Sequence, residues 1–321
     1  MACRFCYSQH FQQNTGGMWS RKEIEETFKD MADIGVKAIS LVSDGESTCN
    51  AEWKHAILYA SALGMDTALG TNGLLYEPID EVQSCMTYLR FNFSAASPSK
   101  YCFIHGVGEN IYQAVIENIR HAVNLKRARG HKVDIGIQMV VYPENFGEIL
   151  PVVYLAKGLG VDYVQLKHCS DDESGKLGIN YASYDLVQGI LQEAQNATDE
   201  TFSVQVKWSK ILAGSKRAYQ RCLAPPLLLQ LSGSGLVAPC GPLFGNKYFR
   251  YHIGSIHTTR FIEMFNSRKY WEIMAHLASD QFDAQTACGS LCLQDACNRY
   301  LSTLGKIPEK PKEKVRHENF V

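Results

Sequence analysis

Cysteines are concentrated near the two ends of this chain of 321 residues. Cys3 and Cys6 open it with two residues between them, and five more follow towards the other end: Cys222, Cys240, Cys288, Cys292 and Cys297. Thiolates are soft ligands, and several of them brought together by short loops can hold an iron–sulfur cluster or a zinc ion. The distribution therefore indicates metal binding at both ends of the chain, with iron–sulfur chemistry as the preferred interpretation.

The composition limits the other possibilities. With 45% apolar residues, the chain can bury a core large enough for one large domain and a smaller one. Lys and Arg (32) nearly balance Asp and Glu (33), which argues against a nucleic-acid surface. No apolar segment reaches the length of a membrane span, and the first twenty residues do not resemble an export signal. We therefore expect a cytoplasmic protein whose eleven cysteines are metal ligands or free thiols.

Helical and strand-like segments alternate from residue 20 onwards. A capping box from Ser20 to Glu23 begins the first helix, and Gly35 ends it. The pattern predicts strands at 37–43, 66–70, 88–94, 132–141 and 162–167, with helices at 51–63, 79–85, 109–129, 146–159 and 183–195. Such alternation is typical of parallel βα units that close into a barrel or form an open sheet. After about residue 200 the alternation stops, and a strand-like segment at 202–208 leads into a second domain.

Several residues lie at or near the C-terminal ends of successive predicted strands, where parallel βα folds place their sites: Gly45 and Glu46, Asn72, Asn92, and Gln138. Together with Cys3-Arg4-Phe5-Cys6, these segments resemble the radical S-adenosylmethionine superfamily. That family holds a [4Fe–4S] cluster with three cysteines and carries a Gly-Gly-Glu-Pro-like turn and a Thr-Asn-Gly turn after the next two strands. Each segment also has an ordinary interpretation, because Asp-Gly and Asn-Gly are common turns and a core amide can be satisfied internally.

The resemblance implies a role for each of these residues. Cys3 and Cys6 are then cluster ligands, with Phe5 as the aromatic residue before the last cysteine. Gly45 and Glu46 bind the methionine ammonium group, and Asn72 belongs to the Thr-Asn-Gly turn. Asn92 takes a ribose hydroxyl, and Gln138 faces the cofactor. Members of the family use the cluster and S-adenosylmethionine to form a 5′-deoxyadenosyl radical that removes hydrogen from a substrate.

Two departures from the family pattern affect these expectations. The first of the three cysteines would lie two places before Met1, and the first barrel strand would precede it, so the N-terminus looks truncated. A misassigned start or a gene fragment explains this most simply, and a degenerate, inactive homologue is the alternative. Asp44 and Ser47 also replace the usual first glycine and the proline, which leaves Gly45 and Glu46 as the remaining determinants of that turn.

The C-terminal cysteines resemble the auxiliary-cluster domain called SPASM, or its shorter relative Twitch. Gly235, between Cys222 and Cys240, permits a tight hairpin that returns the second thiolate towards the first. Because too few cysteines remain for two clusters, we expect one auxiliary [4Fe–4S] cluster, held by Cys222, Cys240, Cys288 and Cys292. Cys297 is then spare or replaces Cys292. A structural zinc site is the alternative, since four cysteines would serve it equally well.

Cys169 directly follows the last predicted strand and is the candidate catalytic residue. It can return a hydrogen atom to a substrate radical, as in radical epimerases, or Lys167 or Asp171 can accept a proton in an oxidation. The ordinary interpretation is a surface loop, in which Asp171-Asp172-Glu173 is a solvated acidic run.

We therefore expect an α/β fold: a partial (β/α)6 TIM-like barrel without its first strand at residues 1–200, a small α+β auxiliary-cluster domain at 201–305, and a disordered tail at 306–321. The expected function is a radical S-adenosylmethionine oxidoreductase acting on a small molecule, with a flavodoxin- or ferredoxin-type electron donor and no nucleic-acid or membrane partner. The alternatives are a radical peptide maturase or epimerase, and a zinc-stabilised binding protein on a degenerate barrel.

Overall fold

The computed structural model describes residues 1–7, 17–42, 45–74, 79–304, 317, 319 and 320. Its main feature is one sheet of six parallel strands whose spatial order follows the chain. The strands are β1 (Ala38–Leu41), β2 (Asp66–Thr71), β3 (Met86–Asn92), β4 (Asp134–Val141), β5 (Tyr163–His168) and β6 (Ser203–Val206). The predicted partial barrel of alternating strands and helices is confirmed.

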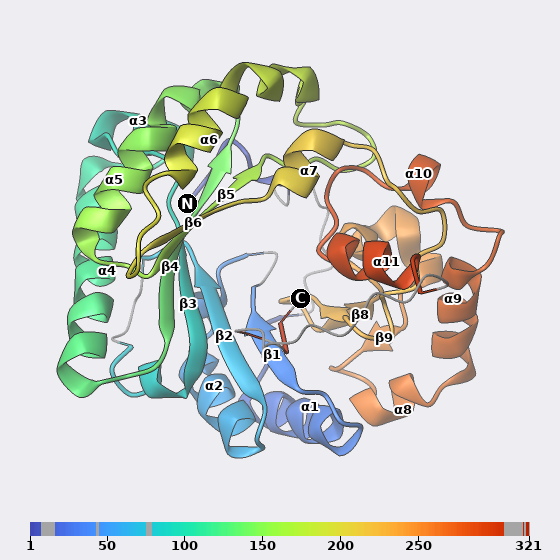
Figure 1. Ribbon diagram of the computed structural model, residues 1–321. Coiled ribbons are helices and arrows are strands. Elements are labelled where there is room, and N and C mark those ends of the chain that lie inside the picture. The colour runs from blue at the N-terminus through green and yellow to red at the C-terminus, as the bar shows by residue number, and fades with distance from the viewer. Residues whose placement is uncertain (8–16, 43–44, 75–78, 305–316, 318, 321) are drawn as a thin grey trace.

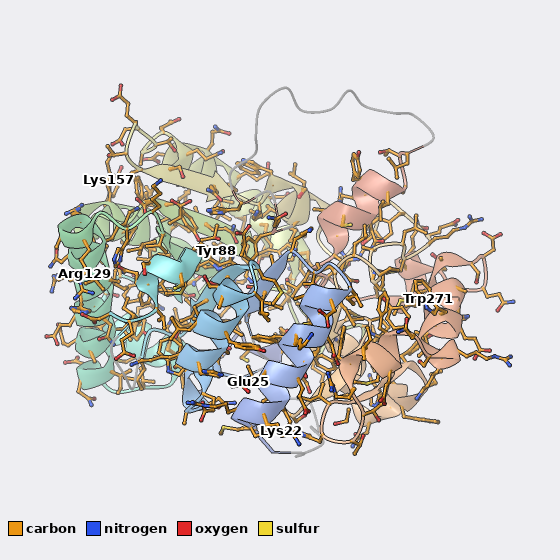
Figure 2. The ribbon with its side chains drawn as sticks, turned by 90° about the horizontal axis from the view of Figure 1, so that it is seen from below. Lys22, Glu25, Tyr88, Arg129, Lys157 and Trp271 are labelled. Atoms are coloured by element: carbon orange, nitrogen blue, oxygen red, sulfur yellow. The ribbon has the colours of Figure 1, made fainter. Side chains whose placement is uncertain are left out.

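The helices cover the outer side of this sheet, which curves around the centre of the molecule (Figure 1). They are α1 (Arg21–Asp33), α2 (Trp53–Ala62), α3 (Pro98–His105), α4 (Glu109–Arg129), α5 (Ile149–Leu159), α6 (Gln188–Gln195) and α7 (Trp208–Ala213). The predicted capping box is present in α1, because Ser20 N donates to Glu23 Oε2 at 2.7 Å and Glu23 N donates to Ser20 Oγ. Figure 2 shows Tyr88 of β3 inward of the outer helices that carry Arg129 and Lys157.

Two expectations for local structure were wrong. The segment 79–85 forms only a 3-10 turn, η3 (Gln83–Cys85), because the buried Gln83 side chain donates to Ala122 O at 2.8 Å and ties the segment beneath α4. The strand-like 202–208 does not leave the sheet. It forms β6, which pairs with β5 from Tyr163 and Ser203 onwards, so the sheet continues past residue 200.

The C-terminal part lies across the gap between the two edge strands, β1 and β6 (Figure 1). It contains a three-stranded antiparallel sheet and four short helices: β7 (Gln230–Leu231), β8 (Leu236–Ala238), β9 (Gly254–Ser255), α8 (Phe261–Phe265), α9 (Arg268–Ala278), α10 (Ala284–Ala287) and α11 (Asp295–Leu301). Gly235, at φ +80°, makes the predicted hairpin between β7 and β8. A Cβ there would lie 2.7 Å from the His257 ring, so the position requires glycine.

Two hydrophobic cores hold the molecule together. The larger lies between the sheet and the helices α2 to α6. The smaller joins Ile24, Phe28 and Met31 of α1 to residues of α8 and α9, so α1 belongs to both parts of the fold. Arg260 also donates to the buried Asp30 carboxylate of α1, and His257 contacts Glu23 at 2.6 Å.

The predicted disorder of the tail falls mainly on residues outside the described part. His317, Asn319 and Phe320 are described, and they contact the N-terminal ends of the strands. His317 Nε2 lies 2.5 Å from Asp134 Oδ2, and the Phe320 and Tyr88 rings are 5.1 Å apart. Within the described part of the chain, no helix is long and apolar enough to cross a membrane.

Candidate active site

The inner face of the sheet is the side turned away from the outer helices. Residues such as Leu89, Ile137 and Leu166 are fully buried against those helices, so the residues that alternate with them point to the inner face. The strand register places four carboxamides in one row across this face: Asn92, Gln138, Gln165 and Gln205. Gln138 Nε2 donates to Asn92 Oδ1 at 2.8 Å, which joins two of the predicted cofactor-binding residues.

Glu46 connects the turns that follow β1 and β2. Its Oε1 accepts hydrogen bonds from Thr48 and from Thr71 Oγ1 (2.8 Å), and its Oε2 accepts one from the backbone N–H of Asn72 at 2.7 Å. A carboxylate has about four lone-pair sites, so Oε2 keeps capacity for a further cationic donor. The Asn72 side chain is used locally, because its Oδ1 accepts from Leu74 N. Gly45 directly precedes Glu46, and residues 43 and 44 lie outside the described residues.

The Cys3–Cys6 loop lies at the same edge of the sheet, against the last turn of α3. The backbone N–H groups of Ala2 and Arg4 donate to His105 O and Ile104 O, and Cys6 N donates to Cys3 O. Cys3 Sγ lies 3.2 Å from His105 Nδ1. The Phe5 ring packs edge-on against His105 and against Tyr142, which follows β4. The two thiols therefore stay close together above the ends of the strands, in a loop whose donor chemistry fits iron.

Cys169 is fully buried immediately after β5 and faces this loop. Its Sγ contacts Phe5 O at 3.8 Å, and its backbone N–H donates to Val141 O and to the Tyr184 hydroxyl. Burial, assisted by the Asp171 charge, raises the pKa of the Cys169 thiol to about 12, so the group stays protonated near neutral pH. Burial, assisted by the Arg90 charge, lowers the pKa of Lys167 to about 7.

The expectation of a solvated acidic run after Cys169 was wrong for two of its three residues. Asp171 and Asp172 are buried, since their carboxylates accept backbone N–H groups of the same loop. Asp171 also anchors the loop to the C-terminal part, because Asp171 N donates to Ser290 Oγ and Leu291 N donates to Asp171 O. Asp171 is thus a positioning residue in this structure rather than a free proton acceptor.

Four C-terminal cysteines meet beside this anchor, although they are up to 70 positions apart in sequence: Cys222, Cys240, Cys288 and Cys292. Burial, followed by the charges of the other three, raises the pKa of Cys240 well above its usual range. Cys297, on α11, is not among the groups that shift the pKa of Cys222, Cys240 or Cys288, whereas Cys292 is, and only burial raises the pKa of Cys297 itself. The structure therefore favours Cys292 over Cys297 as the fourth member.

Two neutral side chains contact these thiols. Asn298 Nδ2 donates to Cys222 Sγ at 3.4 Å, and the Tyr219 hydroxyl lies 3.7 Å from Cys292 Sγ. No set of three or more His, Cys, Asp or Glu side chains is arranged to enclose a single metal ion in the part of the chain that the structure describes. Four grouped thiols are a donor set that either an iron–sulfur cluster or a zinc ion can use.

Sequence analysis missed several residues that the fold brings to the inner face: Arg90, Gln165, Gln205 and Lys207. Their signal is the alternation of polar residues inside strands, as in Arg90 and Asn92. This alternation indicates a sheet whose inner face is polar and does not pack against another apolar layer.

Comparison with known proteins agrees with this geometry. Residues 1–155 match the Radical SAM superfamily model. A curated protein described as a probable GTP 3′,8-cyclase, from Saccharolobus solfataricus, is 25% identical over 180 residues, or 55% of this chain and 56% of that protein. Its counterpart in Saccharolobus islandicus is 25% identical over 179 residues. The chain thus spans little more than half the length of these relatives.

Solved structures show the same fold at low identity. The Streptococcus suis protein SuiB bound to S-adenosylmethionine is 14% identical with a TM-score of 0.64, covering 85% of this chain and 64% of that one. The protein anSMEcpe, with bound AdoMet and the Kp18Cys peptide, is 13% identical with a TM-score of 0.58, covering 95% of this chain and 94% of that one. The family match and the cysteine loop at the strand ends agree: residues 1–155 carry a Radical SAM domain, and proteins of that superfamily use a [4Fe–4S] cluster and S-adenosylmethionine.

Proposed function

We propose that the protein uses S-adenosylmethionine to remove a hydrogen atom from a small polar substrate held at the inner face of the sheet. The observation that carries this proposal is the convergence at one sheet edge of three features from distant parts of the sequence. These are the Cys3–Cys6 loop, the Glu46 carboxylate bonded to Thr71 and Asn72, and the Asn92–Gln138 pair. When bound, the cluster supplies the electron that cleaves the cofactor and so initiates radical chemistry.

The residues of the chain bind and orient the cofactor in this proposal. Cys3 and Cys6 hold iron, and Phe5 shields the cluster loop from one side. Glu46 accepts the methionine ammonium group through the remaining capacity of its Oε2. Asn92 and Gln138 offer amide groups to the ribose, and their mutual hydrogen bond fixes both orientations before the cofactor arrives.

A second cluster on Cys222, Cys240, Cys288 and Cys292 would accept the electron that the substrate radical loses when it is oxidised to product. Two contacts bring this site to the reacting edge. Ser290, between Cys288 and Cys292, bonds the loop that begins at Cys169, and Lys210 Nζ donates to Cys292 O at 3.0 Å. Because four cysteines leave no iron open, its role is electron transfer or positioning, not binding of substrate.

Anaerobic turnover tests the proposal. The full chain as its gene encodes it is reconstituted with iron and sulfide, reduced with dithionite and given S-adenosylmethionine. We expect formation of 5′-deoxyadenosine, and Cys6→Ser to abolish it. Cys85→Ser is the matched control, because Cys85 lies at the opposite ends of the strands and should leave the rate unchanged. A reduced, iron-loaded protein that yields no 5′-deoxyadenosine would contradict the proposal.

Peptide modification is a second candidate. SuiB bound to its precursor peptide SuiA has a TM-score of 0.62 and covers 99% of this chain, and anSMEcpe was also solved with peptides. In an epimerase of this type, the protonated Cys169 thiol would return a hydrogen atom from the side of the cluster loop. Cys169→Ala would then prevent product formation while leaving cofactor cleavage intact, whereas an oxidation would tolerate the change.

A further inference from the structure

Three cationic side chains lie around the carboxamide row on the inner face. Arg90 is one row below it, because the register aligns Gly70, Arg90 and Gly136. Lys167 is one row above it, opposite Val140, and Lys207 follows β6 at the same level, since Lys207 N donates to Leu166 O. Burial is the main cause that lowers the pKa values of Lys167 and Lys207, the Arg90 charge lowers both further, and the Lys207 charge adds to the effect on Lys167, so the three charges are close enough to repel one another.

No carboxylate among the described residues forms an ion pair with Arg90, Lys167 or Lys207. The acidic groups of the neighbouring loop are already used. Asp171 and Asp172 accept backbone N–H groups, and Glu173 pairs with Lys247. Arg90 Nε is buried without a hydrogen-bond partner. Uncompensated cations that repel one another in a partly dry site are costly, which points to a ligand that supplies the missing negative charge.

The surroundings of Arg90 orient the guanidinium. Glycine flanks Arg90 on both neighbouring strands, at Gly70 and Gly136, and the Val42 side chain lies over Gly70. The guanidinium lies over the Tyr88 ring at 5.4 Å, and the Tyr163 ring covers Gly136 so closely that a Cβ there would clash with it. A planar guanidinium held this way can bind two oxygens of one anionic group.

The carboxamide row offers uncharged hydrogen-bond donors and acceptors beside the three cations. The side-chain amides of Gln165 and Gln205 make no hydrogen bond to any residue in the described ranges, so both can donate to and accept from a ligand. Alternate residues along a strand are about 6.6 Å apart. Arg90 on β3 and Lys167 on β5 lie two rows apart with β4 between them, so a ligand that reaches both must be extended or carry more than one charge.

We infer that the substrate is a small organic phosphate. Its phosphate is held by Arg90 with Lys167 and Lys207, and Gln165 and Gln205 form hydrogen bonds to the substrate. This inference deepens the proposed function and rests on it for the reaction itself. A phosphate fits better than a single carboxylate, because one group offers up to two negative charges and three oxygens to several cations. The carboxylate of S-adenosylmethionine is the main rival ligand for the same cations, and the test must separate the two.

Calorimetry on the cluster-loaded protein with S-adenosylmethionine present tests the inference, using inorganic pyrophosphate as the probe at low salt. We expect saturable binding that Arg90→Gln and Lys167→Gln each weaken about tenfold or more, the usual value of a charge-assisted hydrogen bond. Arg129→Gln, on the outer end of α4, is the matched control and should leave binding unchanged. If Arg90→Gln does not fold, Arg90→Lys keeps the charge and should show a smaller loss.

Further measurements distinguish the alternatives. The affinity for S-adenosylmethionine should stay within about twofold in both variants; a tenfold loss there would assign the cations to the cofactor and overturn the inference. Tricarballylate binding more tightly than pyrophosphate would replace the phosphate with a polycarboxylate, and no binding of either anion would also overturn it. Cofactor cleavage without substrate reports on the proposed function separately, so pyrophosphate binding without 5′-deoxyadenosine formation would identify the reaction as the part that failed.

Discussion

At the scale of single residues, the Glu46 carboxylate combines a structural and a binding task. It satisfies donors from Thr48, Thr71 and Asn72, and we propose that it also accepts the cofactor ammonium group. Glu46→Gln removes the negative charge but keeps one acceptor oxygen. We expect the affinity for S-adenosylmethionine, measured by equilibrium dialysis, to fall about tenfold or more, because an ionic hydrogen bond becomes a neutral one.

Glu148 provides a matched control for that experiment. Its carboxylate likewise accepts backbone N–H groups, from Ala96 and Ser97, and the Ser97 hydroxyl. Glu148→Gln should cost similar stability without changing cofactor affinity. Equal losses of affinity in the two variants would mean that Glu46 acts only through the fold.

Lys167 gives a prediction about pH at the same scale. Its pKa falls to about 7 in the folded protein through burial and the Arg90 charge, against about 10.4 in an unfolded chain. Between these values the unfolded chain binds more protons, so the lysine destabilises the fold most below pH 7 and progressively less as the pH rises. Lys167→Met should therefore raise the thermal midpoint more at pH 6.5 than at pH 9. The exposed Lys157→Met serves as control, and a gap that widens with pH would contradict the assignment.

At the scale of elements, α1 is the helix on which the two parts of the molecule meet. Its apolar face contributes to the smaller core, and its buried Asp30 accepts Arg260 and the Ile262 N–H. Asp30→Ala should lower the free energy of unfolding by about 2 kcal/mol, because a buried N–H loses its acceptor while the half-exposed guanidinium can hydrate.

Urea denaturation under anaerobic conditions measures this effect. Asp33→Ala, on the exposed side of the same helix, loses only its pair with Lys29 and should change stability by less than about 0.5 kcal/mol. If the two variants are equally stable, α1 does not depend on the contact with α8.

At the scale of the whole molecule, the C-terminal part spans the gap between β1 and β6 (Figure 1), and its Ser290, between Cys288 and Cys292, contacts the loop that follows β5. We expect Cys240→Ser to remove about half of the bound iron after reconstitution, since one of two [4Fe–4S] clusters is lost. Cys297→Ser should leave the iron content unchanged. Loss of zinc instead of iron from Cys240→Ser would favour the structural zinc site.

The sequence predicted much of the local structure because its signals act over a few residues. The capping box at Ser20, the alternation of strands and helices, and the hairpin at Gly235 each depend on near neighbours, and all three were confirmed. The helix expected at 79–85 was wrong, because a contact of Gln83 with the distant α4 overrides local preference. The prediction that Asp171 and Asp172 are exposed to solvent was wrong for a similar reason, since backbone N–H groups of the folded loop donate to their carboxylates.

The sequence by itself determined which chemistry the protein can perform: thiolates at both ends, a glutamate and amides at successive strand ends, and the parallel βα order. Only the tertiary structure decided which of these residues meet. Cys292 rather than Cys297 lies close to Cys222 and Cys240, the 202–208 segment extends the sheet, and the Arg90 charge acts on Lys167 although β4 lies between their strands. The physical reason is that side-chain type and periodicity are properties of neighbouring residues, whereas these encounters depend on strand register and on the packing of α1 against the C-terminal part.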